Sequence, residues 1–249
     1  MEDVRLHLIG GFELCVGGMP LAGLQPATQR LIAFVALTPR GVEREFAALQ
    51  LWPDTSEERA RANLRSALWR IRRLGVDLIV TSSTRLRLSD DVWVDARQGI
   101  EELARGGGLG AAAGGFDSTL PFQSLLTDLL PDWYEDWLII ERERMRQLSL
   151  RMLEARAAQA LTDGDASTAI QVALAAMSID PLRESAHRLV IEAHLAEGNE
   201  RDAQRTFDGY RQRIAVDARL SPSPELEALV GRRGAALAAA SVASLGAVG

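Results

Sequence analysis

The sequence predicts two domains of different class, an α+β domain at the N-terminus followed by an all-α domain. The length of 249 residues allows one or two domains, because a domain usually takes roughly 100–200 residues. Within residues 1–98, short alternating apolar stretches surround three helical patterns, whereas residues 121–233 are helical almost throughout. Residues 99–120 between them are rich in glycine and alanine, which indicates a linker.

The first residues are expected to form a small antiparallel sheet. Val4–Ile9 alternates apolar with polar side chains, and Phe12–Val16 follows a Gly-Gly pair. A second Gly-Gly pair makes a tight turn before Met19–Leu21. From Pro26 the apolar period changes to that of a helix, which stops near the Pro39-Arg40-Gly41 sequence.

Two more helices are expected after this one. Glu43–Trp52 reads as a short helix that Pro53 ends. The third helix spans about Glu57–Leu74, with Ser56 as a candidate N-cap and Gly75 just beyond its C-terminus.

A hairpin follows the third helix. Leu78–Val80 and Arg85–Leu88 are predicted strands around a polar tip at residues 81–84, and Val92–Val94 is expected to extend the sheet. The order is therefore sheet, three helices and hairpin, with a short polar turn between the second and third helices. This order predicts an α+β winged helix-turn-helix for residues 1–98.

Charge is distributed unevenly along the chain. Arginine supplies all 28 basic residues, and the absence of lysine excludes Walker-A nucleotide binding and Schiff-base catalysis. The formal net charge is −6, but between Arg59 and Leu88 eight arginines accompany one acid, Asp77. Such a basic segment can bind nucleic acid independently of the acidic remainder.

The third predicted helix combines an apolar face with an arginine-rich face. The residues expected to be buried are Ala60, Leu64, Ala67, Leu68 and Ile71. On the opposite face, arginine can bind guanine bidentately, Asn63 can pair with adenine, and Ala62 can contact a thymine methyl group. Hydroxyls and arginines of the hairpin suit backbone phosphates. The residues predicted to contact DNA are Arg59, Arg61, Ala62, Asn63, Arg65, Ser66, Trp69, Arg70, Arg73, Ser82, Ser83, Thr84, Arg85 and Arg87.

The all-α domain, residues 121–233, contains an internal repeat. Leu161–Gly164 aligns with Leu195–Gly198 at a distance of 34 residues, which is the tetratricopeptide length. The close-packing positions that this register predicts are Ala169, Ala173 and Ala176 in the first repeat and Ala203, Phe207 and Tyr210 in the second. Residues 234–249 are rich in alanine, glycine and serine and are expected to form a flexible tail.

Other candidate chemistry is weak. His187 and His194 share one helix face, but no cysteine or third histidine is near in sequence, so we interpret both as core residues rather than metal ligands. Cys15 lies in a predicted strand and is interpreted as a small buried hydrophobic residue. We expect no catalytic residue, no metal and no cofactor. A single cysteine, no signal peptide and no membrane span favour a cytoplasmic protein.

Several segments together resemble a known family. Leu49–Leu74 resembles the second and third helices of the streptomycete antibiotic regulatory protein family. Leu129–Ala155, Asp180–Gln212 and Ser221–Val230 resemble the opening, the later helices and the end of the bacterial transcriptional activation domain. The resemblance covers residues 4–232.

The resemblance implies an OmpR-type winged helix, a tetratricopeptide-like domain and a transcriptional activator that is not an enzyme. Members of the family bind direct repeats in promoter DNA as two protomers side by side, recruit RNA polymerase through its sigma and alpha or beta subunits, and activate secondary-metabolite gene clusters. The resemblance also implies that the protein is associated with the nucleoid. The turn implied to face polymerase consists of Trp52, Pro53, Asp54, Thr55 and Ser56.

A second hypothesis places the protein in a different class. A tetratricopeptide scaffold could use the winged helix as a protein-docking module, and it would then bind proteins or peptides and show no salt-dependent retention of promoter DNA.

Overall fold

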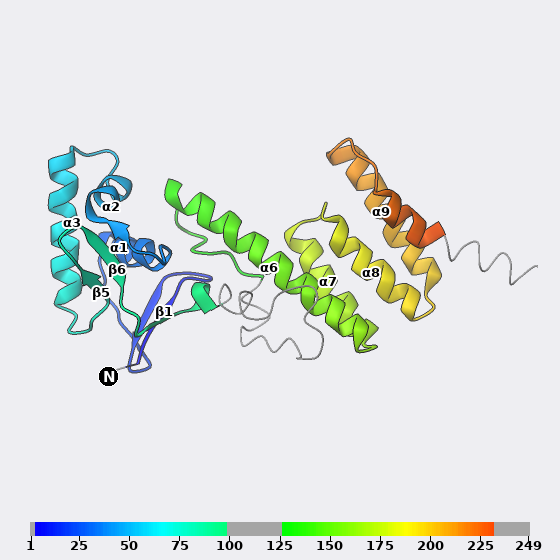
Figure 1. Ribbon diagram of the computed structural model, residues 1–249, viewed down its shortest axis with the longest axis horizontal. Coiled ribbons are helices and arrows are strands. Elements are labelled where there is room, and N and C mark those ends of the chain that lie inside the picture. The colour runs from blue at the N-terminus through cyan, green and yellow to red at the C-terminus, as the bar shows by residue number, and fades with distance from the viewer. Residues whose placement is uncertain (1–2, 99–125, 232–249) are drawn as a thin grey trace, which may run out of the picture. The chain divides into compact units, whose positions relative to one another are not determined.

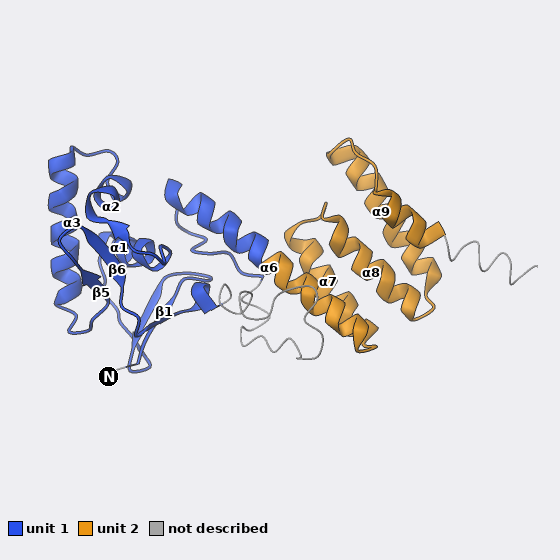
Figure 2. Cartoon of the chain, in the orientation of Figure 1, with its two compact units in different colours: residues 1–105, 118–148 blue, residues 106–117, 149–249 orange. Residues whose placement is uncertain are grey.

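The computed structural model describes residues 3–98 and 126–231 (Figure 1). By contacts between residues the chain divides into two units (Figure 2). Unit 1 comprises residues 1–105 and 118–148, and unit 2 comprises residues 106–117 and 149–249. The predicted linker at 99–120 and the predicted tail at 234–249 lie outside the described residues. No helix in the described ranges combines the length and the apolar character that crossing a membrane requires.

Unit 1 contains two small sheets. The first has the order β3-β2-β1-β7 and the second the order β4-β6-β5. The strands of the first sheet are β1 (Val4–His7), β2 (Glu13–Val16), β3 (Met19–Pro20) and β7 (Val92–Val94). The strands of the second sheet are β4 (Val42–Glu43), β5 (Ile79–Thr81) and β6 (Arg85–Leu88). The predicted N-terminal sheet and hairpin are therefore both present.

Two details differ from the sequence expectation. Glu43 does not begin the second helix, because Val42 and Glu43 pair with Leu86 and Arg85 of β6 and form a third strand beside the hairpin. Val92–Val94 extends the N-terminal sheet, but it runs parallel to β1, whereas the strands of that sheet were expected to be antiparallel. Both differences arise from pairing between strands far apart in the chain, which local periodicity does not encode.

Three helices complete the predicted fold of residues 1–98. They are α1 (Pro26–Ala36), α2 (Arg44–Leu51) and α3 (Glu57–Arg72). All three pack around one core that also takes in the sheets, with Leu6, Leu31 and Leu51 fully buried. This arrangement is the predicted winged helix-turn-helix, with α2 and α3 as the helix pair and β5–β6 as the wing (Figure 1).

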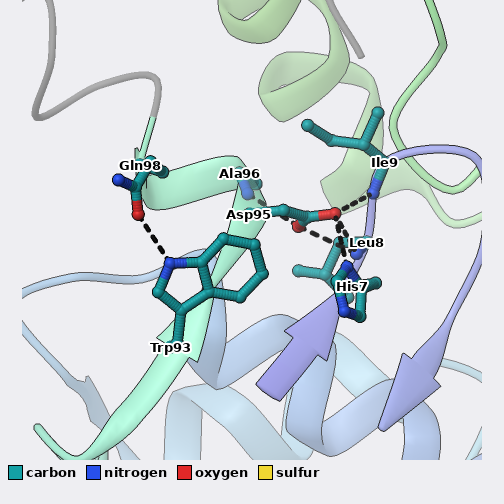
Figure 3. Close-up of polar contacts among 7 residues, drawn as sticks. All are labelled: His7, Leu8, Ile9, Trp93, Asp95, Ala96 and Gln98. Atoms are coloured by element: carbon teal, nitrogen blue, oxygen red, sulfur yellow. Dashed lines mark hydrogen bonds and ion pairs between the residues drawn. The ribbon is translucent and has the colours of Figure 1, made fainter. Parts of the chain in front are cut away.

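The carboxylate of Asp95 lies at the end of β1 and is buried (Figure 3). It accepts hydrogen bonds from the backbone N–H groups of Leu8, at 2.9 Å, and Ile9, at 3.1 Å, and from the N–H of Ala96 at 2.7 Å. Burial raises the pKa of Asp95, although these backbone bonds oppose that rise. The carboxylate satisfies backbone donors that the sheet itself leaves unpaired.

Residues 126–148 pack with the winged helix in unit 1. The N–H of Leu130 donates to the carbonyl of Leu8 at 2.9 Å, and Ile9 forms an antiparallel bridge with Leu129. Leu129, Leu130 and Leu138 are buried in the same core as the three helices. The predicted start of the all-α domain at residue 121 stays a prediction. The contacts of the described residues that follow it belong to unit 1 up to residue 148.

Unit 2 is helical. Its helices are the second part of α6 (Asp136–Thr162), then α7 (Ala166–Ile179), α8 (Glu184–Ala196) and α9 (Glu200–Asp217), followed by a helical segment at residues 224–231. Helix α8 contacts both α7 and α9. The six predicted close-packing positions are all buried: Ala169, Ala173, Ala176, Ala203, Phe207 and Tyr210.

The turns of the two repeats have the same hydrogen bonds. Gly164 and Gly198 have positive φ values of 79° and 78°, which glycine adopts without steric cost. The N–H of Asp165 donates to the Ala160 carbonyl, and 34 residues later the N–H of Asn199 donates to the His194 carbonyl, both at 2.8 Å. This is the Schellman pattern of a helix C-terminus. The predicted 34-residue repeat is thus visible in the backbone.

The predictions that the two histidines and Cys15 are core residues have different outcomes. His187 is buried, with its ring centroid 4.4 Å from that of Tyr210, as expected for a core residue. His194 on the same helix is half-buried. Cys15, by contrast, is half-buried on the sheet face opposite Leu14 and is not part of the core, so its interpretation as a buried hydrophobic residue is wrong.

An ion pair links two helices of unit 2. Arg183 donates to the carboxylate of Glu154 at 2.5 and 2.9 Å, and the hydroxyl of Ser185 donates to the same carboxylate. Burial acts to raise the pKa of Glu154, but the bonds from Arg183 and Ser185 outweigh it and leave the pKa lowered. The folded state therefore favours the ionised carboxylate.

We expect Asp95→Ala to lower the free energy of unfolding of unit 1 by about 1–3 kcal/mol, because it leaves buried N–H groups unpaired. All five tryptophans of the chain lie in unit 1, so tryptophan fluorescence during urea unfolding measures this unit. Asp91→Ala is the matched control, since Asp91 is exposed. Equal stability of the two variants would contradict the role assigned to Asp95.

We expect Glu154→Gln to lower the free energy of unfolding at pH 7 by about 1–3 kcal/mol, because the charge-assisted bonds of Arg183 are lost. A lowered carboxyl pKa stabilises the fold above the unfolded value of about 4.3, and this contribution disappears as pH falls through the folded value. The difference from wild type should therefore shrink in acid. Circular dichroism at 222 nm, which reports helix content, measures this difference in stability during urea unfolding at each pH. Glu225→Gln is the matched control, since Glu225 is exposed.

Candidate nucleic-acid interface

Helix α3 buries one face and exposes the other, as the sequence predicts. Its buried residues are Ala60, Leu64, Ala67, Leu68 and Ile71. Ser56 caps the N-terminus by accepting the N–H of Arg59 at 3.4 Å. Glu57 and Glu58 occupy the first turn and Arg70 and Arg72 the last, which suits the helix dipole. The apolar stripe and the caps thus fix which side of α3 faces away from the core.

The outward face of α3 carries arginines without acidic partners. Arg59, Arg65 and Arg73 are exposed and Arg70 is half-buried, and none of the four forms an ion pair with the described residues. The guanidinium of Arg73 lies 4.8 Å from the ring centroid of Trp69, whose side chain is 57% exposed. Ser66 is exposed on the same face, while Ala62 and Asn63 are half-buried. The positive charge of the four arginines is therefore available to an external anion.

Two other arginines of α3 bind within the protein. Arg61 forms ion pairs with Glu45 of α2 and, at 3.4 Å, with Glu57. The hydrogen bond and charge of Glu45 raise the pKa of Arg61 further. Arg72 donates to the Thr81 hydroxyl at 2.9 Å and so joins α3 to the wing. Arg61 was predicted to contact DNA, and in this structure its charge is already compensated.

A shallow hollow of about 590 Å³ lies beside the outward face of α3. Its lining residues are Arg44, Arg65, Ser66, Leu68, Trp69, Arg70 and Arg72. A second hollow of about 280 Å³ lies beside it. Its lining residues are Glu43, Arg44, Glu45, Arg61, Leu64 and Arg65 together with Ser83 and Thr84 of the wing tip. Arg44 and Arg65 border both hollows, so the two lie side by side along α3.

Arg44 borders both hollows but was not among the residues predicted from the sequence to contact DNA. It is the first residue of α2, and its backbone N–H donates to the Thr84 carbonyl at 2.7 Å, which places it against the wing. Its guanidinium reaches the Ser82 carbonyl at 3.5 Å. Only the pairing of β4 with β6 brings Arg44 to this surface, and the one available signal was a basic residue at the start of the second helix.

The two arginines of the wing have partners within the protein. Arg85 donates to the carbonyls of Arg40 and Gly41 at 3.3 and 3.2 Å and lies 3.7 Å from the carboxylate of Glu43. Arg87 forms an ion pair with Asp90. The predicted wing contacts thus divide into exposed tip residues, Ser82, Ser83 and Thr84, and two arginines with internal partners.

The turn between α2 and α3 is partly anchored. Trp52 is half-buried and packs on the core, and the hydroxyl of Thr55 donates to its carbonyl at 3.0 Å. Pro53, Asp54 and Ser56 are exposed. These three side chains are the part of the turn that is open to a partner.

This fold and this basic face are those of a winged-helix transcriptional regulator. The chain belongs to the bacterial transcriptional activator domain family, whose family model matches residues 96–232. The family resemblance predicted from the sequence is thereby confirmed, and such regulators are not enzymes. A comparison with curated proteins gives no match.

The chain is also similar to a solved structure, Mycobacterium tuberculosis EmbR in complex with a low-affinity phosphopeptide. The sequence identity is 22% and the TM-score is 0.79, and the match covers 93% of this chain and 65% of the EmbR chain. The predicted fold class, a winged helix followed by an all-α domain, agrees with this likeness. The chain spans less than two thirds of the length of EmbR.

We expect Gly41→Ala to destabilise unit 1, because Gly41 has a φ of 72° and an added Cβ would lie 2.8 Å from the Leu86 carbonyl oxygen in β6. Gly75→Ala is the matched control, since Gly75 has a φ of 78° with open space around it. Gly41→Ala should lose at least about 1 kcal/mol more of the free energy of unfolding, measured by tryptophan fluorescence in urea. Equal losses would show that the wing strand can shift away.

Proposed function

We propose that this protein is a sequence-specific, DNA-binding transcriptional activator. Helix α3 and the wing bind direct repeats in double-stranded promoter DNA, two protomers side by side, and the protein recruits RNA polymerase to a secondary-metabolite gene cluster at the nucleoid. The observation that carries this proposal is a set of arginines on the outward face of α3 that form no ion pair with the described residues, namely Arg59, Arg65, Arg70 and Arg73.

The chemistry of this face fits duplex DNA. A guanidinium group can donate two parallel hydrogen bonds to O6 and N7 of guanine in the major groove, which is wide enough for a helix. Arg44 and the hydroxyls of Ser83 and Thr84, beside the second hollow, suit backbone phosphates. We therefore assign base recognition to α3 and the positioning of the duplex to Arg44 and the wing tip.

The remaining roles are proposed from the family. The exposed part of the turn at Trp52–Ser56 is assigned to RNA polymerase, through its sigma and alpha or beta subunits. For the domains we propose a winged helix at residues 1–98, a linker at 99–120, a transcriptional activation domain at 121–233 and a tail at 234–249.

Footprinting of the full chain on its own genomic neighbourhood tests the proposal. Two protected tracts about one DNA turn apart, whose protection falls steeply as salt rises, are the expected result. Absence of any protected tract, together with retention of proteins or peptides, would favour the docking scaffold instead.

We expect Arg65→Ala and Arg73→Ala each to weaken specific DNA binding by about 1–3 kcal/mol, which is the range for a bidentate arginine–guanine contact. Arg61→Ala is the matched control on the same helix. Because Arg61 is paired with Glu45 and Glu57, its removal should weaken binding by clearly less. Titration of labelled promoter fragments at fixed salt measures the three affinities.

The order of these effects decides the assignment. If Arg61→Ala weakens binding as much as Arg65→Ala does, the ion pairs of Arg61 with Glu45 and Glu57 do not keep Arg61 from contributing to DNA binding. Unchanged binding in Arg65→Ala and Arg73→Ala would remove α3 from the proposed interface.

A further inference from the structure

Three metal-binding residue types gather on the outer face of the N-terminal sheet. His7 on β1 lies directly opposite Glu13 on β2, and Cys15 follows Glu13 by two residues on the same strand. Side chains two apart in a strand share a face, so all three lie on the side opposite the buried Leu6 and Leu14. None of the three residues belongs to the DNA-binding face, and no metal was expected from the sequence.

The donor atoms of these residues converge. One imidazole nitrogen, one carboxylate oxygen and the thiol sulfur all lie within 4.8 Å of one another. His7 and Cys15 are half-buried and Glu13 is exposed, so the group borders solvent and a cation can enter. Two paired strands hold the three side chains, and rigid elements of this kind position ligands better than loops do.

The surroundings of His7 orient its ring. Its Nδ1 atom lies 3.7 Å from a carboxylate oxygen of the buried Asp95, and its ring centroid lies 5.3 Å from that of Trp93 (Figure 3). Metal-binding histidines commonly turn one ring nitrogen toward a carboxylate and bind the metal with the other. In that arrangement Nε2 would be the nitrogen of His7 that binds the metal.

We propose that His7, Glu13 and Cys15 form a site for a divalent transition metal of the Zn²⁺ type. Thiolate and imidazole ligands select borderline and soft cations such as Zn²⁺ over Mg²⁺ and Ca²⁺. The thiolate and the carboxylate together carry two negative charges, which balance a divalent cation. Three protein ligands leave a fourth position for water, as in zinc sites that remain open to a further ligand.

The thiol of Cys15 has to lose its proton when a cation binds. Burial raises the pKa of the Cys15 thiol, and the charge and hydrogen bond of Glu13 raise it further, whereas Arg5 acts in the opposite direction. Arg5 is itself paired with Asp3 at 2.8 Å. A bound cation must therefore replace the thiol proton, which leaves to solvent as the metal–sulfur bond forms.

Cobalt(II) titration of the full chain, after removal of metal with a chelator, tests the site. Wild type should bind one equivalent and develop the near-ultraviolet charge-transfer absorption of a thiolate–cobalt bond, and Zn²⁺ should displace the cobalt. Cys15→Ser should abolish this absorption. His7→Gln and Glu13→Gln should each raise Kd by at least about tenfold, since even outer-shell partners of metal ligands contribute that much.

The same substitutions elsewhere in the chain provide controls. His194→Gln and Glu225→Gln lie in unit 2 and should leave the cobalt affinity unchanged. Glu13 is exposed, so Glu13→Gln keeps the test valid even if His7→Gln perturbs the sheet, which tryptophan fluorescence would reveal. The proposal is overturned if wild type shows no thiolate–cobalt absorption, or if Glu13→Gln binds cobalt with wild-type affinity.

Discussion

The buried carboxylate of Asp95 joins parts of unit 1 that are far apart in the chain. It holds the backbone N–H groups of Leu8 and Ile9 at the end of β1, and the carbonyl of Leu8 accepts the N–H of Leu130. Arg142 of α6 then donates to the carbonyls of Leu129 and Leu130. Because buried backbone groups need partners, residues 126–148 complete the winged helix although the family match assigns them to the activation domain.

The internal pairing of arginines decides which part of the basic segment is available to DNA. Arg61, Arg85 and Arg87 are paired with acids, and Arg72 holds the wing against α3. Of the arginines that remain on the outward face, Arg65 and Arg70 border the hollows, where Arg44 joins them. Pairs near the surface contribute little to stability, so we interpret these contacts mainly as a means of orienting the wing and α3.

Unit 2 repeats the same helix–turn–helix arrangement every 34 residues. The glycine turns at Gly164 and Gly198 have the same φ and the same hydrogen bonds, and small residues such as Ala173 and Ala176 let neighbouring helices approach closely. The ion pair of Glu154 and Arg183 adds a contact that the repeat pattern does not predict. Its members are 29 residues apart, so only the packing of the helices brings them together.

The sequence by itself determined the three helices of residues 1–98 apart from the start of the second, the Ser56 cap and the two faces of α3, because apolar periodicity and cap residues act locally. It also determined the repeat, since equivalent residues recur at a fixed spacing. Tertiary structure alone decided that β7 pairs with β1, that Arg44 meets the wing and that Cys15 faces outward beside His7. Each of these depends on strand pairing between distant segments, and a strand's register and neighbours are set by the whole fold rather than by its own residues.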